Sequence, residues 1–387
     1  MDFRFEVLKT DPSGARLGRL ETPHGVIETP AFMPVGTLGT VKGLTQESLE
    51  ALGTQVILAN TYHLYLRPGA ELIREMGGLH KFMSWPHPIL TDSGGYQVFS
   101  LSDLRKVTDE GVTFRSHIDG SEHSLSPERA IEIQLALGSD IMMVLDECIE
   151  ASSSEERAAA AAARTLAWAR RSRDYFSEHD DAQRQIMFGI VQGGAHAELR
   201  RKSADETVQL DFPGYAIGGL AVGEPHEVTC EMTAQVTARL PADRPRYLMG
   251  VGRPEQIVDY VARGVDMMDC VLPTRSARHG CLFTWQGRIL IKNACYAKDP
   301  RPIDPACPCP TCRRYSRAYL RHLFLSKELL AATLTTLHNV YFYLDIMAEI
   351  RKSIRFGNLL GFRSDLQARL ENSVSESGAA SGTESNR

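Results

Sequence analysis

The chain has 387 residues, of which 43% are hydrophobic and 24% are charged, the balance of an ordinary globular protein. No apolar run reaches the roughly 18 residues that a membrane span requires, and the segment MDFRFEVLKT is no signal peptide, so we expect a cytoplasmic protein without membrane contacts. The net charge of −5 excludes a chain that is basic throughout. Between residues 270 and 360, however, 14 Lys and Arg stand against 5 Asp and Glu, which indicates a polyanion site or a solvated basic face.

The first thirty residues alternate polar and apolar side chains around turns, which predicts β-hairpins. After them, short apolar runs alternate with helical segments such as the capped stretch SPERAIEIQLALG, and residues 112–126 are predicted to form an inserted hairpin. Buried strands that alternate with helices predict an α/β protein with a closed (β/α)₈ TIM barrel. An open doubly wound sheet is the competing fold, but no GxGxxG follows the first strand. The eight predicted strands are residues 31–35, 56–60, 88–91, 141–146, 187–192, 215–220, 246–251 and 267–272.

Polar residues and glycines occur where these strands end, which is where a barrel carries its chemistry. They are Asp92, Asp146, Gln192, Gly218, Gly219, Met249, Gly250 and Asp269. Each one alone is explained by ordinary turn chemistry, and an aspartate such as Asp269 often closes a strand and caps the next turn. Their occurrence on successive strands instead predicts one shared site.

Two carboxylates, one a nucleophile and one an acid/base, suit transfer at a glycosidic carbon through a covalent intermediate. A third carboxylate can accept the N1–H and exocyclic amine of guanine together, and Gln192 and the N–H of Gly219 could donate to O6. Arg275 and Arg278, which follow Asp269 closely, are typical of phosphate binding or base reading.

Three cysteines lie close together in Cys307-Pro-Cys309-Pro-Thr-Cys312, a spacing that indicates zinc in a reduced protein. Spacing alone leaves the fourth ligand open among Cys295, His322 and His338. A closed tetrahedral Cys₃His site is structural, so we expect one zinc ion per chain that fastens a small subdomain and does not activate water.

The segments TDSGGYQVFSL, FGIVQGG, YAIGGLAVGE, YLMGVG and DCVLPTRSARHG resemble the bacterial tRNA-guanine transglycosylases, the queuine tRNA-ribosyltransferase family, and the resemblance extends over residues 3–369. It implies Asp269 as the nucleophile on ribose C1′, Asp92 as the general acid/base and His338 as the fourth zinc ligand. It implies that the base-binding residues are Asp92, Ser93, Gly94, Gly95, Tyr96, Asp146, Gln192, Gly219, Leu220 and Met249. The implied tRNA-binding residues are Gly250, Val251, Gly252, Arg253, Pro254, Glu255, Gln256, Thr274, Arg275, Ser276, Ala277 and Arg278.

The implied activity exchanges the wobble guanine, position 34, of tRNAs with GUN anticodons for 7-aminomethyl-7-deazaguanine, a step of queuosine biosynthesis. Val222 and Cys148 match the bacterial side of the family, and Val222 is expected to exclude the bulkier base queuine. The family also implies a homodimer that binds one tRNA. The chain departs from its relatives after Cys148, where IEASSSEERAA replaces a segment with Pro and Tyr, and His279 stands where Asn is common.

Residues 1–372 are predicted to form the barrel domain, with a zinc-binding subdomain at about 275–355 inserted toward its C-terminal side. The polar, Ser- and Gly-rich residues 373–387 are predicted to be a disordered tail without a further nucleic-acid-binding domain. Two other functions compete with transglycosylation. One is a catalytically silent zinc-dependent RNA-binding protein, against which the intact Asp92 and Asp269 argue. The other is an N-glycoside hydrolase, in which water would replace the incoming base.

Overall fold

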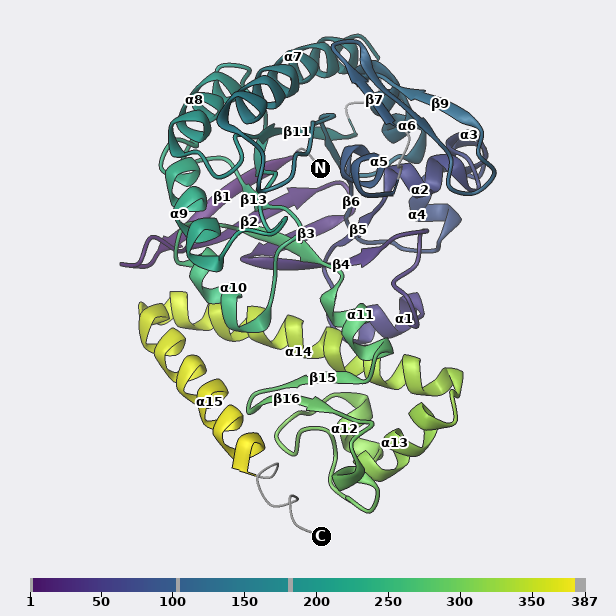
Figure 1. Cartoon of the computed structure of the whole chain (residues 1–387), viewed down its shortest axis with the longest axis vertical. Coiled ribbons are helices and arrows are strands. Elements are labelled where there is room, and N and C mark those ends of the chain that lie inside the picture. The colour runs from purple at the N-terminus through teal and green to yellow at the C-terminus, as the bar shows by residue number, and fades with distance from the viewer. Residues whose placement is uncertain (1–2, 102–104, 180–183, 380–387) are drawn as a thin grey trace.

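A closed barrel of eight strands forms the centre of the molecule in the computed structural model, which describes residues 3–101, 105–179 and 184–379 (Figure 1). Every neighbouring pair of barrel strands is parallel, including the pair β14–β4 that closes the ring. The predicted (β/α)₈ barrel is therefore confirmed. Its strands are β4 (Ala31–Gly36), β5 (Ile57–Ala59), β6 (Ile89–Thr91), β10 (Ile141–Met143), β11 (Ile186–Val191), β12 (Gly214–Ile217), β13 (Arg246–Leu248) and β14 (Met267–Cys270).

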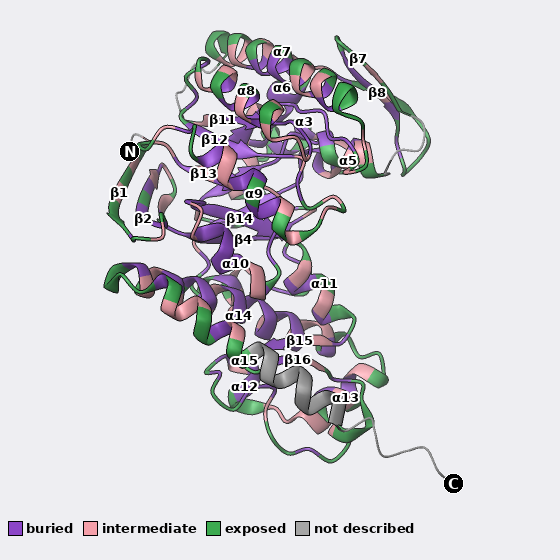
Figure 2. Cartoon of the chain, turned by 60° about the vertical axis from the view of Figure 1, so that its left-hand side comes forward, coloured by how far each residue is buried: buried purple, intermediate pink, exposed green. Residues whose placement is uncertain are grey.

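The barrel strands are buried on both faces, as continuous apolar runs require (Figure 2). Several strands are shorter than the apolar runs that predicted them. The clearest case is the last run, whose strand ends at Cys270, since Pro273 occupies the first turn of helix α11 (Leu272–Arg278). This early turn leaves Asp269 close to the end of its strand.

Helices cover the outside of the barrel, and most begin and end at the signals in the sequence. In α6, the Ser126 side chain accepts a hydrogen bond from the Arg129 N–H, Pro127 occupies the first turn, and Gly138 ends the helix in the left-handed conformation. The predicted outer helices are α1 (Gln46–Ala51), α6 (Pro127–Leu137), α7 (Glu155–His179), α8 (Ala197–Val208), α9 (His226–Thr237) and α10 (Pro254–Val261). Three short helices between β5 and β6 were not predicted: α2 (Thr61–Leu66), α3 (Ala70–Glu75) and α4 (Gly78–Phe82).

The N-terminal hairpins form an antiparallel sheet of β1 (Arg4–Thr10), β2 (Arg16–Thr22) and β3 (Gly25–Thr29). This sheet is attached to the starts of the barrel strands. Arg16 forms a buried ion pair with Asp266, just before β14, and His24 contacts Asp140, just before β10. The sheet therefore lies at the amino-terminal end of the barrel and leaves the opposite end open for a site.

The predicted inserted hairpin is part of a three-stranded antiparallel sheet that follows α5 (Gly95–Leu101). Its strands are β7 (Arg105–Thr108), β8 (Gly111–Arg115) and β9 (Glu122–Leu125). Arg164 and Arg171 on α7 bind the turn between β7 and β8 through Asp109, which fixes the sheet against the outside of the barrel.

A second, smaller layer follows the barrel. It contains the β-ribbon β15 (Cys281–Thr284) and β16 (Gly287–Leu290), the 3₁₀ helix η1 (Ala294–Tyr296), and the helices α12 (Pro310–Arg314), α13 (Arg317–Leu325), α14 (Leu329–Phe356) and α15 (Leu359–Ala379). Within this layer, helix α14 lies on the side next to the barrel in both views (Figures 1 and 2). Helix α15 enters the segment predicted as a disordered tail, whose residues 380–387 lie outside the described part of the chain.

Among the described residues, no helix combines the length and the apolar character that crossing a membrane would require.

Candidate functional site

Asp92 follows β6 at the open end of the barrel and is almost completely buried. Three donors hold its carboxylate: the Thr61 N–H at 2.8 Å on Oδ1, and the side-chain amides of Gln97, at 2.8 Å, and Asn60 on Oδ2. Burial nevertheless dominates and raises the pKa of Asp92 to about 6, with a smaller contribution from the negative charge of Asp269. A carboxyl group with this pKa can both give and take a proton near neutral pH.

Asp269 lies in β14 and is also buried. Its Oδ1 accepts hydrogen bonds from the Tyr247 hydroxyl at 2.6 Å and from the Gly250 N–H at 2.8 Å. Burial raises the pKa of Asp269, and these two donors oppose that effect by stabilising the charged form. Both of these donors bind the same oxygen of the carboxylate.

Asp146 follows β10 and forms a buried polar cluster with Gln192, which follows β11. The Gln192 Nε2 donates to Asp146 Oδ2 at 2.7 Å, while Ser93 donates to Oδ1 at 3.1 Å. Oδ2 also accepts a hydrogen bond from the Cys148 thiol at 3.4 Å. The Gln192 Oε1 is buried and finds no hydrogen-bond partner among the described residues. A carboxylate and an amide oxygen that are buried side by side can recognise a polar, planar ligand, so this cluster is the candidate pocket for such a ligand.

Glycines bring main chain close to this pocket. A Cβ on Gly95 would lie 2.6 Å from the Asp146 carbonyl oxygen, and one on Gly219 would lie 2.2 Å from Gln192 Oε1. Gly219 also has a φ of +63°, in the left-handed region that favours glycine. Both positions therefore require glycine for the pocket to keep its shape. Leu220 is buried beside it, whereas the Tyr96 side chain on α5 is 49% exposed and reaches the surface.

All three carboxylates act electrostatically on one buried tyrosine, Tyr247. The pKa of the buried Tyr247 is raised well above its usual value by burial and then by Asp269, with further contributions from Asp92 and Asp146. Tyr247 therefore remains a neutral hydrogen-bond donor to Asp269. The structure thus brings Asp92, Asp146 and Asp269 from three different strands to the carboxyl end of the barrel, as the strand-end pattern predicted.

Three side chains that contact the carboxylates were not recognised in the sequence: Asn60, Gln97 and Tyr247. A signal was present for Asn60, because it directly follows β5 and therefore lies at the same barrel end as Asp92. Gln97 lies in the first turn of α5, five residues after Asp92. Tyr247 lies inside β13. A tyrosine that donates to Asp269 and an ordinary core tyrosine differ only in the direction of the side chain, which the sequence does not show.

The residues expected to bind tRNA divide into three groups by their burial. Five are buried inside the loop 250–256 and α11: Val251, Gly252, Pro254, Thr274 and Ala277. Three are partly buried: Glu255, Gln256 and Ser276. Gly250, Arg253, Arg275 and Arg278 are exposed. Arg278 is oriented by its own helix, since its Nε donates to the Thr274 carbonyl oxygen at 3.1 Å. Arg253 lies in the loop whose Gly250 N–H binds Asp269, and Arg275 and Arg278 lie on α11, which follows β14.

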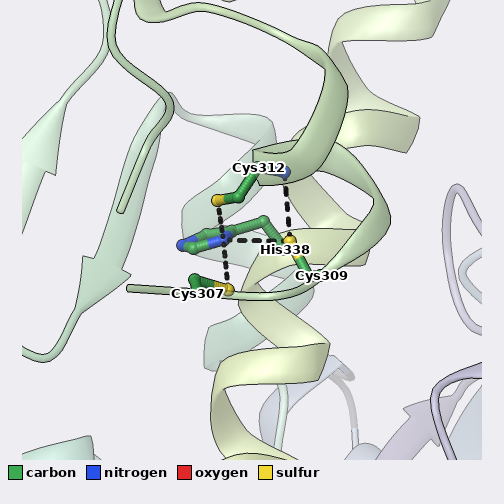
Figure 3. Close-up of side chains that lie close together, drawn as sticks. All are labelled: Cys307, Cys309, Cys312 and His338. Carbon is green, nitrogen blue, oxygen red and sulfur yellow. Dashed lines mark hydrogen bonds between the residues drawn. The ribbon is translucent and has the colours of Figure 1, made fainter. Parts of the chain in front are cut away.

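The four predicted metal ligands lie together in the C-terminal layer (Figure 3). The Sγ atoms of Cys307, Cys309 and Cys312 are 3.8, 3.6 and 3.3 Å from the Nδ1 of His338, and all four residues are buried. These spacings match the edges of a tetrahedron around an ion with bonds of about 2.0–2.3 Å. The His338 Nε2 lies 2.7 Å from the Phe283 carbonyl oxygen, which leaves Nδ1 free to bind a metal.

The two other candidates for the fourth ligand are elsewhere. Cys295 is exposed in η1, and His322 is exposed on α13. The long helix α14 brings His338 to the cysteines, and those cysteines belong to the apolar cluster that also contains Leu282, Leu320 and Leu334.

This fold and site define a class: a (β/α)₈-barrel enzyme with three carboxylates at its mouth and an attached Cys₃His layer. The family described as queuine tRNA-ribosyltransferase matches residues 11–372. A protein of that name from Koribacter versatilis is 57% identical over 366 residues, covering 92% of this chain and 95% of the relative. One from Pelotomaculum thermopropionicum is 58% identical over 357 residues, with the same coverage. One from Listeria innocua is 55% identical over 363 residues, covering 94% and 95%. The chain belongs to the queuine tRNA-ribosyltransferase family.

Proposed function

We propose that the protein is a tRNA-guanine transglycosylase, a pentosyltransferase that exchanges the wobble guanine of tRNAs with GUN anticodons, those for aspartate, asparagine, histidine and tyrosine. The incoming base is 7-aminomethyl-7-deazaguanine, so the reaction is a step of queuosine biosynthesis. The observation that carries this proposal is the difference between two buried carboxylates: donors bind both oxygens of Asp92, whereas the Tyr247 hydroxyl and the Gly250 N–H both bind Oδ1 of Asp269.

In the proposed reaction, Asp269 Oδ2 attacks C1′ of the ribose and the bond from C1′ to N9 of guanine breaks. Asp92 gives its proton to the departing base, which needs one to leave as a neutral molecule. The product is a covalent ribosyl ester on Asp269. The incoming base then transfers its N9 proton to Asp92, attacks C1′ and releases Asp269. Two displacements at the same carbon retain its configuration.

Asp146, Gln192 and the main chain at Gly219 bind the base in this proposal. The carboxylate accepts the N1–H and the exocyclic amine, while an N–H of the Gly219 segment donates to O6. A purine that binds in this way must take the place of the Gln192 amide on Asp146, which frees that amide to donate to O6 as well. Tyr96, at the surface, stacks on the base.

Zn²⁺ is the metal proposed for Cys307, Cys309, Cys312 and His338, because three thiolates and one imidazole in a closed tetrahedron are typical of structural zinc. The ion supplies cross-linking and no chemistry. The ligands join the loop 307–312 to α14, so the ion fixes the layer that carries much of the basic segment 270–360.

Arg253, Arg275 and Arg278 are proposed to contact the anticodon loop, because they are exposed beside Asp269 and a polyanion is attracted to such a group. We also propose a homodimer. The turn between α13 and α14 exposes large apolar side chains, Leu325 at 50%, Leu329 at 87% and Leu330 at 42%, which a second copy could cover. The molar mass in solution by light scattering tests the dimer.

The preference for the aminomethyl base is proposed to depend on Val222, which is half-buried after β12. Its N–H and that of Ala221 bind the Glu224 carboxylate, so the backbone there has little freedom to retreat from a larger substituent. Val222→Gly should therefore raise the incorporation of queuine relative to the aminomethyl base. Equal use of both bases by the unaltered protein would contradict this preference.

Exchange of labelled guanine into unfractionated tRNA tests the function itself. The proposal predicts label in tRNA, with uptake confined to the tRNAs with GUN anticodons and without net loss of purine. Release of guanine without uptake would identify an N-glycoside hydrolase. Binding of tRNA with neither release nor uptake would identify an RNA-binding protein without catalysis.

A further inference from the structure

Arg200, in the first turn of α8, is fully buried, which is unusual for a cation. Burial lowers its pKa to about 10, so the side chain remains charged at neutral pH, and the negative charge of Glu224 offsets part of the cost. A guanidinium that stays charged inside a protein needs a partner for its N–H groups. Each partner that Arg200 has is a main-chain carbonyl oxygen: Gly194 on Nε at 2.8 Å, Gly218 and Val191 on Nη1 at 2.8 and 3.3 Å, and Gly219 on Nη2 at 3.0 Å.

These carbonyl groups come from the ends of two adjacent strands, β11 and β12. The chain after β11 carries Gln192, and the chain after β12 carries Gly219 and Leu220. One planar side chain therefore joins the two segments that form the base pocket of the proposed function. A lysine could not do the same, because its single ammonium group cannot donate hydrogen bonds to several carbonyl groups in a fixed plane.

The direction of these hydrogen bonds decides where the N–H groups point. In a trans peptide the C=O and the following N–H point in opposite directions. The carbonyl groups of Gly218 and Gly219 face Arg200, so the N–H groups of Gly219 and Leu220 face away from it. On the pocket side, Gly218 lies against Gln192 and Asp146, since a Cβ there would be 2.8 Å from Gln192 Nε2 and 3.5 Å from Asp146 Oδ2.

We infer that Arg200 is a positioning residue for base recognition: it holds two consecutive peptide groups so that the N–H groups of Gly219 and Leu220 are presented to O6 of the purine. A charged donor on each carbonyl oxygen also polarises the peptide and strengthens its N–H as a donor. Arg200 itself does not touch the base. This inference rests on the proposed function, because it assumes that a guanine-like base occupies the pocket.

The test compares two ligands that differ only at the 6-position. Guanine carries an oxygen there, and 6-thioguanine carries sulfur, a weak acceptor, while both keep the N1–H and the amine that Asp146 would accept. Binding of each base is measured by calorimetry in the holoenzyme and in Arg200→Met and Arg200→Lys. Arg201→Met is the matched control, because Arg201 is the next residue of α8 and binds Glu198 and Gln235 at the surface.

Arg200→Met should weaken guanine binding about ten-fold or more, the effect of one or two misdirected hydrogen bonds. It should weaken 6-thioguanine binding much less, so that the preference for guanine over 6-thioguanine shrinks. The KM for guanine should rise while the affinity for tRNA stays unchanged. Arg200→Lys should resemble Arg200→Met, and Arg201→Met should behave as the unaltered protein.

An equal loss for guanine and 6-thioguanine would overturn the inference, because it would mean that Arg200 only supports the fold. Unchanged guanine binding in either Arg200 variant would overturn it as well. Should Arg200→Met fail to fold, the same comparison in Arg200→Lys decides between these outcomes. Failure of the proposed function is distinguishable from all of them, since the unaltered protein would then exchange no guanine into tRNA.

Discussion

The barrel mouth and the Cys₃His layer both bury groups that prefer to be charged, but the two regions compensate for that in different ways. At the mouth, Asp92, Asp146 and Asp269 are buried with hydrogen bonds from neutral donors, and burial raises the pKa of all three. In the Cys₃His layer, the four buried side chains surround a single point that a metal ion can occupy. The cation would neutralise its ligands there.

Because of this difference, the two regions affect the stability of the folded protein in opposite directions. The carboxylates at the mouth are destabilising in the folded protein, because they would be better solvated in the unfolded chain. The Cys₃His cluster is stabilising when it holds its metal, because an unfolded chain has no preformed site. Removal of a charged group should therefore have opposite consequences in the two regions, and four experiments can break or sharpen this contrast.

The largest expected effect is the loss of catalysis in Asp269→Asn. The amide oxygen can still accept from Tyr247 and the Gly250 N–H, so the fold should be unchanged, but an amide is not a competent nucleophile. Base exchange and the denaturation-resistant tRNA adduct should both disappear on gels. Asp243→Asn, at an exposed aspartate, is the control and should keep both. An adduct that persists in Asp269→Asn would show that another residue is the nucleophile.

Asp92→Asn should slow the exchange by about 10²–10⁴-fold, the usual contribution of a general acid/base. Because the pKa of Asp92 is raised to about 6, its acid form decreases as the pH rises above that value. Single-turnover release of guanine should therefore slow above about pH 6 in the unaltered enzyme. The residual rate of Asp92→Asn should lack this dependence. The same pH profile in both proteins would assign the titrating group elsewhere.

Cys309→Ala should remove the metal and lower the thermal stability, with an activity loss smaller than that of either aspartate variant. Binding of free guanine should persist while tRNA binding weakens, because the metal would hold the basic layer and not the base pocket. Elemental analysis should find one zinc per chain in the unaltered protein and none in the variant. Cys295→Ala, at an exposed cysteine outside the cluster, should change nothing. A fully active, metal-free unaltered enzyme would refute the zinc assignment.

The smallest effect concerns stability at the mouth. The pKa of Asp269 is higher in the folded protein than in the unfolded chain. Below its unfolded value both states are protonated and no penalty exists, whereas at higher pH the folded protein carries a buried charge. Asp269→Asn should therefore melt at about the same temperature as the unaltered protein near pH 4, and a few degrees higher at pH 8. A difference in melting temperature that does not grow with pH would mean that the hydrogen bonds fully compensate the buried charge.

The eight apolar runs and the capped helices between them predicted the barrel, because buried parallel strands and amphipathic helices leave distinct local patterns. The same order placed Asp92, Asp146 and Asp269 at one end, since parallel strands in a barrel share a carboxyl end. The cysteine spacing predicted the cluster. The short helices α2–α4 are not predicted by the sequence, because five or six residues are too few to show the periodic apolar pattern of a helix.

Only the tertiary structure decided which distant side chains complete each site. His338 was one of three possible partners for the cysteines until α14 brought it within 3.8 Å of each of them. Asn60 and Tyr247 contact Asp92 and Asp269 only because neighbouring strands align in one register. Arg200 resembles a surface arginine in the sequence, yet packing buries it against the main chain that follows β11 and β12. Such contacts depend on the relative placement of segments far apart in the chain, which local sequence patterns do not encode.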